Sequence, residues 1–386
     1  MSAAEPDRGA RRVVVVAGMH RAGTSVVARG LMALGLDMGE ALMSADPRMN
    51  ARGFFEDLDI VAMDDALLDA QGADWKSLAL LDGVDWRAPG HAAARDAARR
   101  LLAAKLARTG RFAFKDPRVS RLLPFWRCVF DEARADDAYV IAVRHPRAVI
   151  DSLTARDDLD PRRSAWLWLT HLLCALRYTH GRPRVVVDYD RMLEAPHREL
   201  ARIAHALALP PDALARAQAD PFAREFVSGE LRHAHYAADE LPPGLPAGVA
   251  EAHALAQRLA RDAASVSDAD AIAGIDRLFD AHAAMSPLFA YAGSVERNAD
   301  DVPRLARELA WARGALAQAT TYNEDLKSAV QRKDEDLAAA DAYQTDLLAT
   351  LARKEGELVA AHALLDRMRE KLVGRMLLRR IERKPR

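Results

Sequence analysis

Eight residues near the N-terminus combine glycines, a cation and two hydroxyls in an order suited to anion binding. They read GMHRAGTS, follow the β-branched run from Val13 to Ala17, and precede a stretch of helical periodicity from about Thr24 to Leu34. This pattern predicts a strand, a loop and a helix. Loop glycines allow close backbone approach, and the amides and dipole at a helix start favour negative charge. The residues expected to bind the anion are Arg21, Ala22, Gly23, Thr24 and Ser25.

The same loop argues against an ATPase or GTPase. Its pattern is G-x-x-x-x-G-T-S, so Thr24 stands where the Walker sequence places its lysine. The alternative is a glycine-rich turn that binds nothing. The coincidence of Arg21, glycine and two hydroxyls at a helix start favours the anion site.

A second segment suited to anion binding follows the hydrophobic run from Val140 to Val143. Arg144 ends this predicted strand, Pro146 suits the first turn of a helix, and Ser152 lies two turns further along. Arginine offers bidentate, charge-assisted hydrogen bonds and serine offers a neutral donor. The pair suits an isolated phosphate monoester better than a metal-bound phosphate chain.

Three more polar residues are candidates for chemistry at the same site. Lys115 begins the sequence Lys-Asp-Pro-Arg at a predicted strand end, where α/β sheets gather ligand residues. It could bind an anion or form a salt-bridged turn with Asp116. Glu56 follows two phenylalanines and could instead be an acid at a helix start, and His20 lies inside the loop.

These motifs resemble the sulfotransferases that use 3'-phosphoadenosine 5'-phosphosulfate (PAPS). The family has a K/R-x-G-T-S/T loop, matched by Arg21 to Ser25, and an arginine and a serine eight residues apart, matched by Arg144 and Ser152. The likeness is closest to bacterial members that read GMHRSGTS, NPRGFxE and KDPR, where this chain has GMHRAGTS, NARGFFED and FKDPR. It covers roughly residues 12 to 240, and Ala22 and Ala51 replace the family's serine and proline.

The resemblance implies transfer of a sulfuryl group from PAPS to a hydroxyl or amine, with a saccharide or lipid-linked glycan as the expected acceptor. The Arg21 loop would bind the 5'-phosphosulfate, Arg144 and Ser152 the 3'-phosphate, and Arg232 would lie near the adenine end. No metal is expected.

The resemblance also gives roles in the chemistry to four residues. Glu56 is the expected base, and His20 competes with it for that role. Arg21 and Lys115 would stabilise charge on the bridging and leaving oxygens.

Two other functions share some of these features. A nucleotide or small-molecule kinase of P-loop type would have the same strand, loop and helix but would need ATP and magnesium. A non-catalytic coiled-coil scaffold could carry a degenerate nucleotide fold. The missing Walker lysine argues against the first, and Arg21, Arg144 and Ser152 argue against the second.

The elements around these motifs predict an α/β fold with a P-loop-type parallel sheet flanked by helices. The strand candidates are continuous hydrophobic runs, as in a sheet covered on both faces: Val13 to Ala17, Phe112 to Lys115, Tyr139 to Val143 and Val185 to Tyr189. Helical patterns cover His91 to Arg108 and Ser164 to Tyr178, and an Ala-rich helical cap is expected from about Leu200 to Leu288. The expected domains are a polar tail (1–11), the sulfotransferase domain (12–295), a coiled coil (303–372) and a basic tail (373–386).

Beyond Pro303 the pattern changes to a heptad seam in which spacings of four and three alternate without a slip. Its members are Leu305, Leu309, Ala312, Leu316, Ala319, Asn323, Leu326, Val330, Lys333, Leu337, Ala340, Gln344, Leu347, Leu351, Lys354, Leu358, Ala361, Leu365, Met368 and Leu372. The sequence predicts self-association through a coiled coil, parallel or antiparallel, with a single unpartnered helix as the alternative.

Composition limits the partners and the compartment. The net charge is −1, so nucleic acid is not an expected partner. The two cysteines, Cys128 and Cys174, lack metal spacing and indicate a reducing compartment. We expect a cytoplasmic protein. The tail KLVGRMLLRRIERKPR is compatible with peripheral contact to the inner membrane surface, and equally with a solvated end.

Overall fold

The structure, a computed structural model, describes residues 11–46, 53–222, 236–237, 240–262 and 264–381 of the 386-residue chain. It divides into two compact units, Met1–Glu296 and Arg297–Arg386. The first unit contains the sheet, and the second continues the last helix.

The core of the first unit is a four-stranded parallel sheet in the order β2-β1-β3-β4. The strands are β1 (Arg12–Ala17), β2 (Arg111–Lys115), β3 (Asp136–Val143) and β4 (Arg184–Asp188). All four predicted strands are therefore present, and the α/β class is confirmed. One detail differs, because Tyr189 begins a helix instead of closing the last strand.

Alternate residues of each strand enter two separate hydrophobic clusters, as expected for a sheet covered on both faces. On β1, Val13 and Val15 belong to one cluster, while Val14 and Val16 belong to the other. All four side chains are fully buried. The continuous β-branched run in the sequence reflects this burial on both faces.

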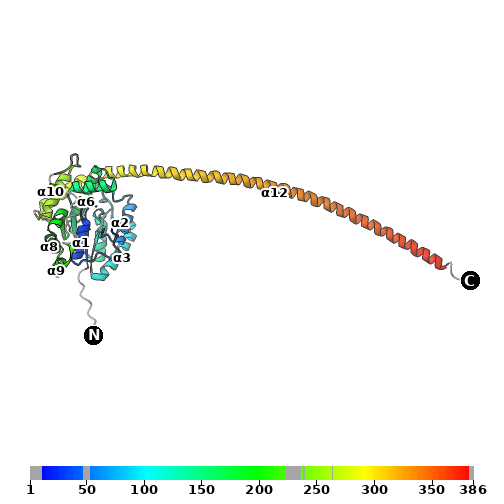
Figure 1. The fold of residues 1–386 in the computed structure, drawn as a ribbon, viewed down its shortest axis with the longest axis horizontal. Helices are drawn as coiled ribbons and strands as arrows, with labels where there is room; N and C mark the ends of the chain where they lie inside the picture. The colour runs from blue at the N-terminus through cyan, green and yellow to red at the C-terminus, as the bar shows by residue number, and fades with distance from the viewer. Residues whose placement is uncertain (1–10, 47–52, 223–235, 238–239, 263, 382–386) are drawn as a thin grey trace, which may run out of the picture. The chain divides into compact units, whose positions relative to one another are not determined.

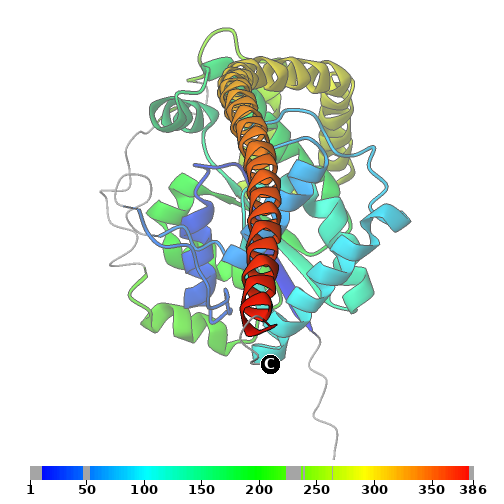
Figure 2. The ribbon, with the colours of Figure 1, turned by 90° about the vertical axis from the view of Figure 1, so that its right-hand side faces the viewer.

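Helices cover the two faces of the sheet. One face packs against α1 (Thr24–Ala33), α7 (Tyr189–Glu194), α8 (Pro196–Ala206) and α9 (Asp212–Ala219). The other packs against α2 (Leu58–Ala70), α3 (Ala92–Thr109), α4 (Val119–Ala133), α6 (Pro161–Tyr178), α10 (Val249–Ala260) and α11 (Ala269–Ala283). Figure 1 shows α8 and α9 on one side and α2 and α3 on the other, and Figure 2 shows blue α1 and cyan α3 on opposite sides.

Two short elements complete this unit. The 3-10 turn η1 (Pro89–His91) leads into α3, and α5 (Pro146–Asp157) follows β3 directly. The helices expected as a cap divide between the faces, since α8 and α9 pack with α1 whereas α10 and α11 pack with α6.

The last helix, α12 (Ser286–Ile381), has 96 residues and is continuous through Pro303. It contains the whole heptad seam. The helix begins before the predicted boundary at residue 303, and residues 382–386 of the basic tail lie outside the described residues.

Candidate functional site

The Gly18–Ser25 loop is held rigidly by the elements around it. Gly18 has φ +147° and donates its N–H to Ser120 Oγ at 2.9 Å. A Cβ at this position would lie 2.6 Å from the carbonyl oxygen of Ala142 on β3. Gly23, with φ +89°, ends the loop as the residue before α1, and a Cβ there would collide with the ring of Tyr189. Both positions therefore require glycine.

The loop ends as predicted, at the start of a helix. Helix α1 begins at Thr24, directly after Gly23, and the N–H groups of Val26 and Val27 donate to the Gly23 carbonyl oxygen at 3.0 and 3.2 Å. The positive end of the helix dipole therefore lies at the loop. Arg21 has φ 68°, an uncommon conformation for a residue with a side chain. The backbone thus has the geometry that favours an anion at this point.

The second predicted anion segment lies against this loop. Arg144 follows β3, Pro146 is the first residue of α5, and Ser152 lies on that helix. The Arg21 side chain donates from Nε to Ser152 Oγ at 2.7 Å, and Arg144 Nη1 donates to the Arg21 carbonyl oxygen at 3.3 Å. Ser152 and Arg144 are 131 and 123 residues from Arg21 in the sequence, so the two predicted anion segments meet only in the folded chain.

Arg144 is a buried cation without a carboxylate partner among the described residues. Its exposed fraction is 7%, and its guanidinium lies 4.4 Å from the centroid of the Tyr189 ring. Its Nε has no hydrogen-bond partner in the described part of the chain. Because burying an unpaired charge is costly, this guanidinium is a candidate to receive an anionic ligand.

The two segments follow the strands between which the chain reverses its direction of winding. From β1 the chain continues to β2 on one side, whereas from β3 it continues to β4 on the other. In open parallel sheets, ligands bind at this switch point, outside the carboxyl ends of the two strands. The Arg21 loop follows β1 and Arg144 follows β3, so both lie at this position.

The end of β2 brings together two more predicted residues. Lys115 and Glu56 are 3% and 4% exposed and form an ion pair between Lys115 Nζ and Glu56 Oε1. Lys115 Nζ also donates to the Phe54 carbonyl oxygen at 3.2 Å. The sequence indicates both residues as candidates but gives no sign that they pair.

Two carboxyl groups that the sequence did not indicate as a pair, Asp64 and Asp116, interact with each other, and the charge of Glu56 also acts on Asp116. Both are fully buried. Burial raises the pKa of Asp116 to about 6, against the lowering effect of Arg118. Burial, and next the charge of Asp116, raise the pKa of Asp64 well above its ordinary value. The sequence did contain a sign that Asp64 is buried, because it falls on the face of α2 that otherwise carries Ile60, Val61, Leu67 and Leu68.

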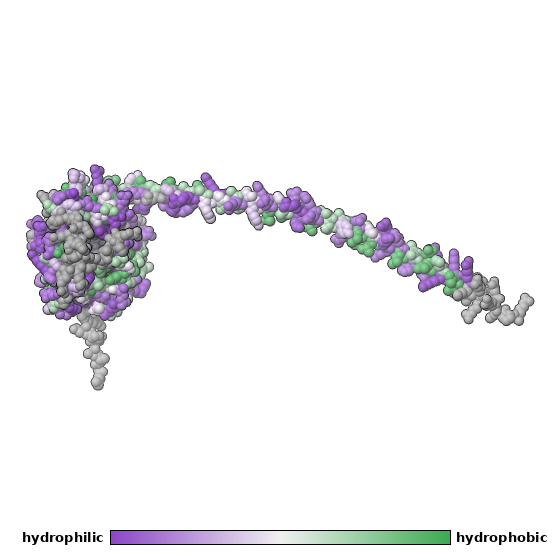
Figure 3. Space-filling view, in the orientation of Figure 1, coloured by the Kyte–Doolittle hydropathy of each residue, from purple (hydrophilic) through white to green (hydrophobic). Residues whose placement is uncertain are grey.

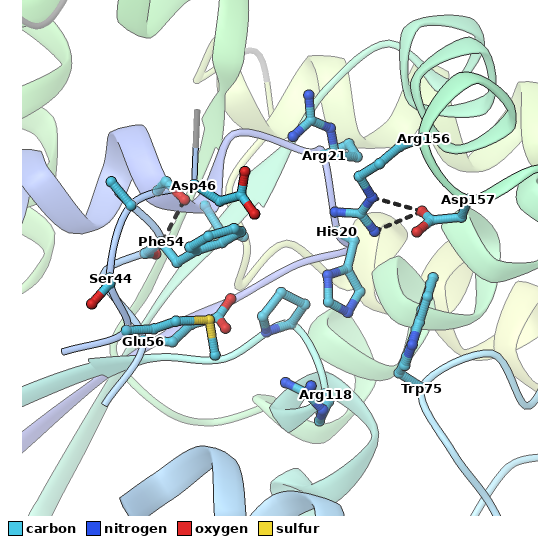
Figure 4. A pocket seen from close by; sticks show the side chains of 15 residues that line it. His20, Arg21, Ser44, Asp46, Phe54, Glu56, Trp75, Arg118, Arg156 and Asp157 are labelled. Atoms are coloured by element: carbon cyan, nitrogen blue, oxygen red, sulfur yellow. Dashed lines mark hydrogen bonds and ion pairs between the residues drawn. The ribbon is translucent and has the colours of Figure 1, made fainter. Parts of the chain in front are cut away.

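A pocket of 500 Å³ opens beside these residues. It is lined by the predicted residues His20, Arg21, Thr24, Ser25 and Glu56. Arg118, the arginine of the Lys-Asp-Pro-Arg segment and also a candidate from the sequence, lines it as well. Lining residues that the sequence did not indicate include Asp46, Phe54, Trp75, Arg156 and Asp157. Figure 4 shows guanidinium, carboxylate, imidazole and indole groups around one space.

His20 is neutral within this pocket. Burial, and then the charges of Lys115 and Arg118, hold its pKa well below 6.5. Its ring lies 4.6 Å from that of Trp75, and its Nε2 has no hydrogen-bond partner among the described residues. The imidazole can therefore exchange a hydrogen bond with a bound molecule, but protonating it would add a third cation beside two others.

The loop that carries Trp75 is fixed by a buried arginine. Arg121 on α4 is 1% exposed and donates to the carbonyl oxygens of Asp74 and Ala79, at 2.9 and 2.6 Å. These bonds hold both ends of the segment that presents the indole. Only the tertiary contact identifies this role, since Arg121 carries no motif.

The remaining predicted residues are placed as follows. Ala22 is buried in the loop, at 2% exposed. Lys115, Arg144 and Ser152 adjoin pocket residues without lining the pocket themselves. Arg232 and Ala51 lie outside the described residues.

Two features are absent from the described part of the chain. Within the described ranges, no cluster of three or more histidine, cysteine, aspartate or glutamate side chains is arranged to hold a metal ion. None of the described helices is both long enough and apolar enough to cross a membrane.

The fold can be compared with those of known proteins. No family model matches the chain, and no curated protein matches it. Among solved structures, the chain is similar to the sulfotransferase domain from the Synechococcus PCC 7002 olefin synthase, with 18% sequence identity and a TM-score of 0.33. The aligned region covers 66% of this chain and 94% of that chain.

Proposed function

We propose that this protein is a sulfotransferase that moves a sulfuryl group from PAPS to a hydroxyl or amine, with a saccharide as the acceptor. The observation that carries the proposal is the position of Arg144. It is a buried guanidinium without a carboxylate partner among the described residues, hydrogen-bonded to the Arg21 loop and next to the switch point of the sheet.

The residues fit a nucleotide with two separated anionic groups. Arg144 and Ser152 would hold the 3'-phosphate, where guanidinium and hydroxyl donors suit a dianionic monoester. The Arg21 side chain and the amides at the start of α1 would hold the 5'-phosphosulfate. The Arg21–Ser152 hydrogen bond of 2.7 Å supports binding of both groups by one continuous site.

In the proposed reaction, the acceptor oxygen or nitrogen forms a bond to sulfur while the bond from sulfur to the bridging phosphate oxygen breaks. The acceptor proton passes to a base, and adenosine 3',5'-bisphosphate leaves. Positioning and charge stabilisation would supply most of the rate enhancement, as in phosphoryl transfer. Arg21 and Lys115 would stabilise negative charge on the leaving oxygens.

Two groups are candidates for the base, and the geometry favours Glu56. It lines the pocket as a carboxylate held by Lys115, so its position is fixed. His20 lines the same pocket, but its lowered pKa makes it a poor acceptor of a full proton. We assign proton removal to Glu56 and a hydrogen bond to the acceptor to His20.

The pocket also supports a hydroxyl-rich acceptor. Trp75 offers a flat apolar face, and the carboxylates of Asp46 and Asp157 and the guanidinium of Arg118 offer acceptors and donors for sugar hydroxyls. The preference for a saccharide rests on this lining and on the resemblance of the sequence motifs.

Ligand binding tests the nucleotide directly. Adenosine 3',5'-bisphosphate should raise the melting temperature, whereas 5'-AMP should raise it less and ATP with magnesium should not raise it, because Arg144 requires the 3'-phosphate. A rise with ATP and magnesium and none with the bisphosphate would favour the kinase alternative. No rise with any nucleotide would favour the scaffold.

Transfer of radiolabelled sulfate to glycan and lipid fractions tests the reaction. Glu56→Gln should lower kcat at least about 100-fold with little change in bisphosphate affinity, and His20→Asn should lower it less. Equal labelling by wild type and Glu56→Gln would contradict the assignment of the base.

A further inference from the structure

The heptad seam of α12 is a long apolar face that the described residues leave exposed. Its large apolar side chains, from Leu305 to Leu372, are each between 48% and 68% exposed. Figure 3 shows hydrophobic residues at the surface along this helix. A seam of roughly three to four heptads already indicates a coiled coil, and this seam is much longer. We therefore expect a partner helix.

We infer that the partner is α12 of a second copy of this chain, in antiparallel orientation, with the two-fold axis between Ala338 and Ala339. In an antiparallel pair each seam residue faces one residue of the other helix, and the seam from Leu305 to Leu372 is symmetric about this axis. Every seam position therefore has a seam position opposite it.

The four polar seam residues identify the register. With this axis, Lys333 faces Gln344 of the second copy, and Asn323 faces Lys354. Each lysine meets an amide oxygen that can accept its hydrogen bond. Each lysine also has an acid within its own helix, at 3.6 Å for Asp336 and 2.8 Å for Glu357.

The small seam residues are matched in the same register. Each alanine faces a leucine, so no layer consists of two small side chains. The pairs are Ala312 with Leu365, Ala319 with Leu358, and Ala361 with Leu316. Next to the axis, Ala340 faces Leu337. This alternation of small and large side chains keeps the packing even along the seam.

A parallel, in-register pair would keep amide pairs at Asn323 and Gln344 but would lose the matching of the lysines and of the alanines. Lys333 would face Lys333 of the second copy, and Lys354 would face Lys354. Four layers would contain two alanines each, which leaves gaps in the packing. Like charges in two layers and voids in four argue against this arrangement.

Neighbouring antiparallel registers fail as well. A shift by one heptad in either direction places Lys333 opposite Leu351 or Leu337. Asn323 then faces Ala361 or Leu347. Each shift buries polar groups against apolar ones, at a cost that the symmetric register avoids.

Charged residues that flank the seam form one attractive and one repulsive pair between the two helices. Glu308 comes close to Lys371 of the second copy, whereas Asp334 comes close to Asp341. The two aspartates flank the layer that contains Lys333, whose charge offsets theirs. The seam residues themselves therefore select the orientation.

Disulfide cross-linking tests the orientation. Chains carrying Ala319→Cys or Leu358→Cys, with tags of different length, are oxidised alone and after mixing. The native Cys128 and Cys174 are buried, and the parent chain measures their background. We expect a covalent heterodimer in the mixture and none from either variant alone. Cross-linking of each variant with itself, or no heterodimer in the mixture, would overturn the proposal.

A charge change at one polar layer gives a second test by sedimentation equilibrium. Gln344→Glu places a carboxylate opposite Lys333 and should lower the dimer dissociation constant roughly tenfold, through two ion pairs per dimer. Gln344→Lys should raise it by a similar factor. In a parallel pair both variants would place like charges together, so a dissociation constant that is unchanged or raised for Gln344→Glu would contradict the antiparallel register.

Discussion

The carboxyl ends of β2 and β3 each carry a buried cation, but the two cations are in opposite situations. Lys115 at the end of β2 has the carboxylate of Glu56 as its partner. Arg144 at the end of β3 has no carboxylate partner among the described residues and packs on Tyr189 instead. At the end of β2 the protein itself supplies the anion, Glu56, whereas at the end of β3 a ligand can supply it.

This difference indicates that Lys115 organises the site, whereas Arg144 is placed to bind an anionic ligand. The ion pair fixes Glu56 against the pocket, and removing either partner leaves a buried charge alone. In the ligand-free protein, Arg144 is a buried charge without a carboxylate partner among the described residues, which costs free energy of folding. An anion that binds there should therefore gain more binding free energy than it would beside a solvent-exposed cation.

Replacing Lys115 should have the largest effect on the stability of the protein. Lys115→Met leaves Glu56 buried without its cation and should lower the free energy of unfolding by about 3–5 kcal/mol. The double variant Lys115→Met with Glu56→Gln should recover much of this loss because it removes both charges. Urea unfolding of the four proteins of this cycle measures the coupling. Equal stability of the single and double variants would show that the ion pair is not the cause.

The pH dependence of stability should differ between the two strand ends. Burial raises the pKa of Asp116, next to Lys115, from 3.8 to about 6, so the folded state binds its proton more tightly than the unfolded state. The resulting stabilisation is full below pH 3.8 and is lost as pH rises through about 6. It amounts to roughly 3 kcal/mol at most, at about 1.4 kcal/mol per pKa unit.

Comparison with Asp116→Asn removes this contribution together with the effect of the Asp116 charge on the pKa of Asp64, and both act in the same direction. Wild type should lose stability relative to the variant as the pH of a urea titration is raised from 4 to 7. An Arg144→Met variant should keep the wild-type slope, because no buried carboxylate among the described residues pairs with Arg144. A difference between wild type and Asp116→Asn that does not change with pH would contradict the raised pKa.

Replacing Arg144 should affect ligand binding more than folding. Arg144→Met removes a charge-assisted contact and should weaken adenosine 3',5'-bisphosphate binding by about 1.5–3 kcal/mol, while the ligand-free protein loses little stability. Isothermal calorimetry measures the first and urea unfolding the second.

The matched control for this variant is Arg29→Met, because Arg29 is paired with Asp220 at 2.7 Å and does not line the pocket. Its bisphosphate affinity should equal that of wild type. Equal losses of affinity in the two variants would remove Arg144 from the nucleotide site.

Ser152 should give the smallest effect. Ser152→Ala removes a neutral donor and the acceptor of the 2.7 Å bond from Arg21, and should cost about 1 kcal/mol of bisphosphate binding. The same calorimetric titration detects this as roughly a fivefold change in affinity. A loss as large as that of Arg144→Met would mean that the serine positions the arginines instead of contacting the ligand alone.

Local sequence patterns determined much of the framework. The continuous runs ending at Ala17, Lys115 and Val143 predicted three strands, and glycine and proline marked the starts of α1 and α5. These features depend on residues close together in the chain, through backbone sterics and side-chain periodicity. The heptad spacing likewise predicted the helical character of residues 303–372, which α12 confirms.

Which charged groups meet depends on contacts between residues far apart in the chain. The Lys115–Glu56 pair spans 59 residues and the Arg21–Ser152 bond spans 131, so their formation depends on the order of the strands and the packing of the helices. The same holds for the absence of a carboxylate near Arg144 among the described residues, and for the buried position of Asp64 beside Asp116. Residue types and spacing specify which groups can act, whereas burial and distance, which set their charge and partners, come from the whole fold.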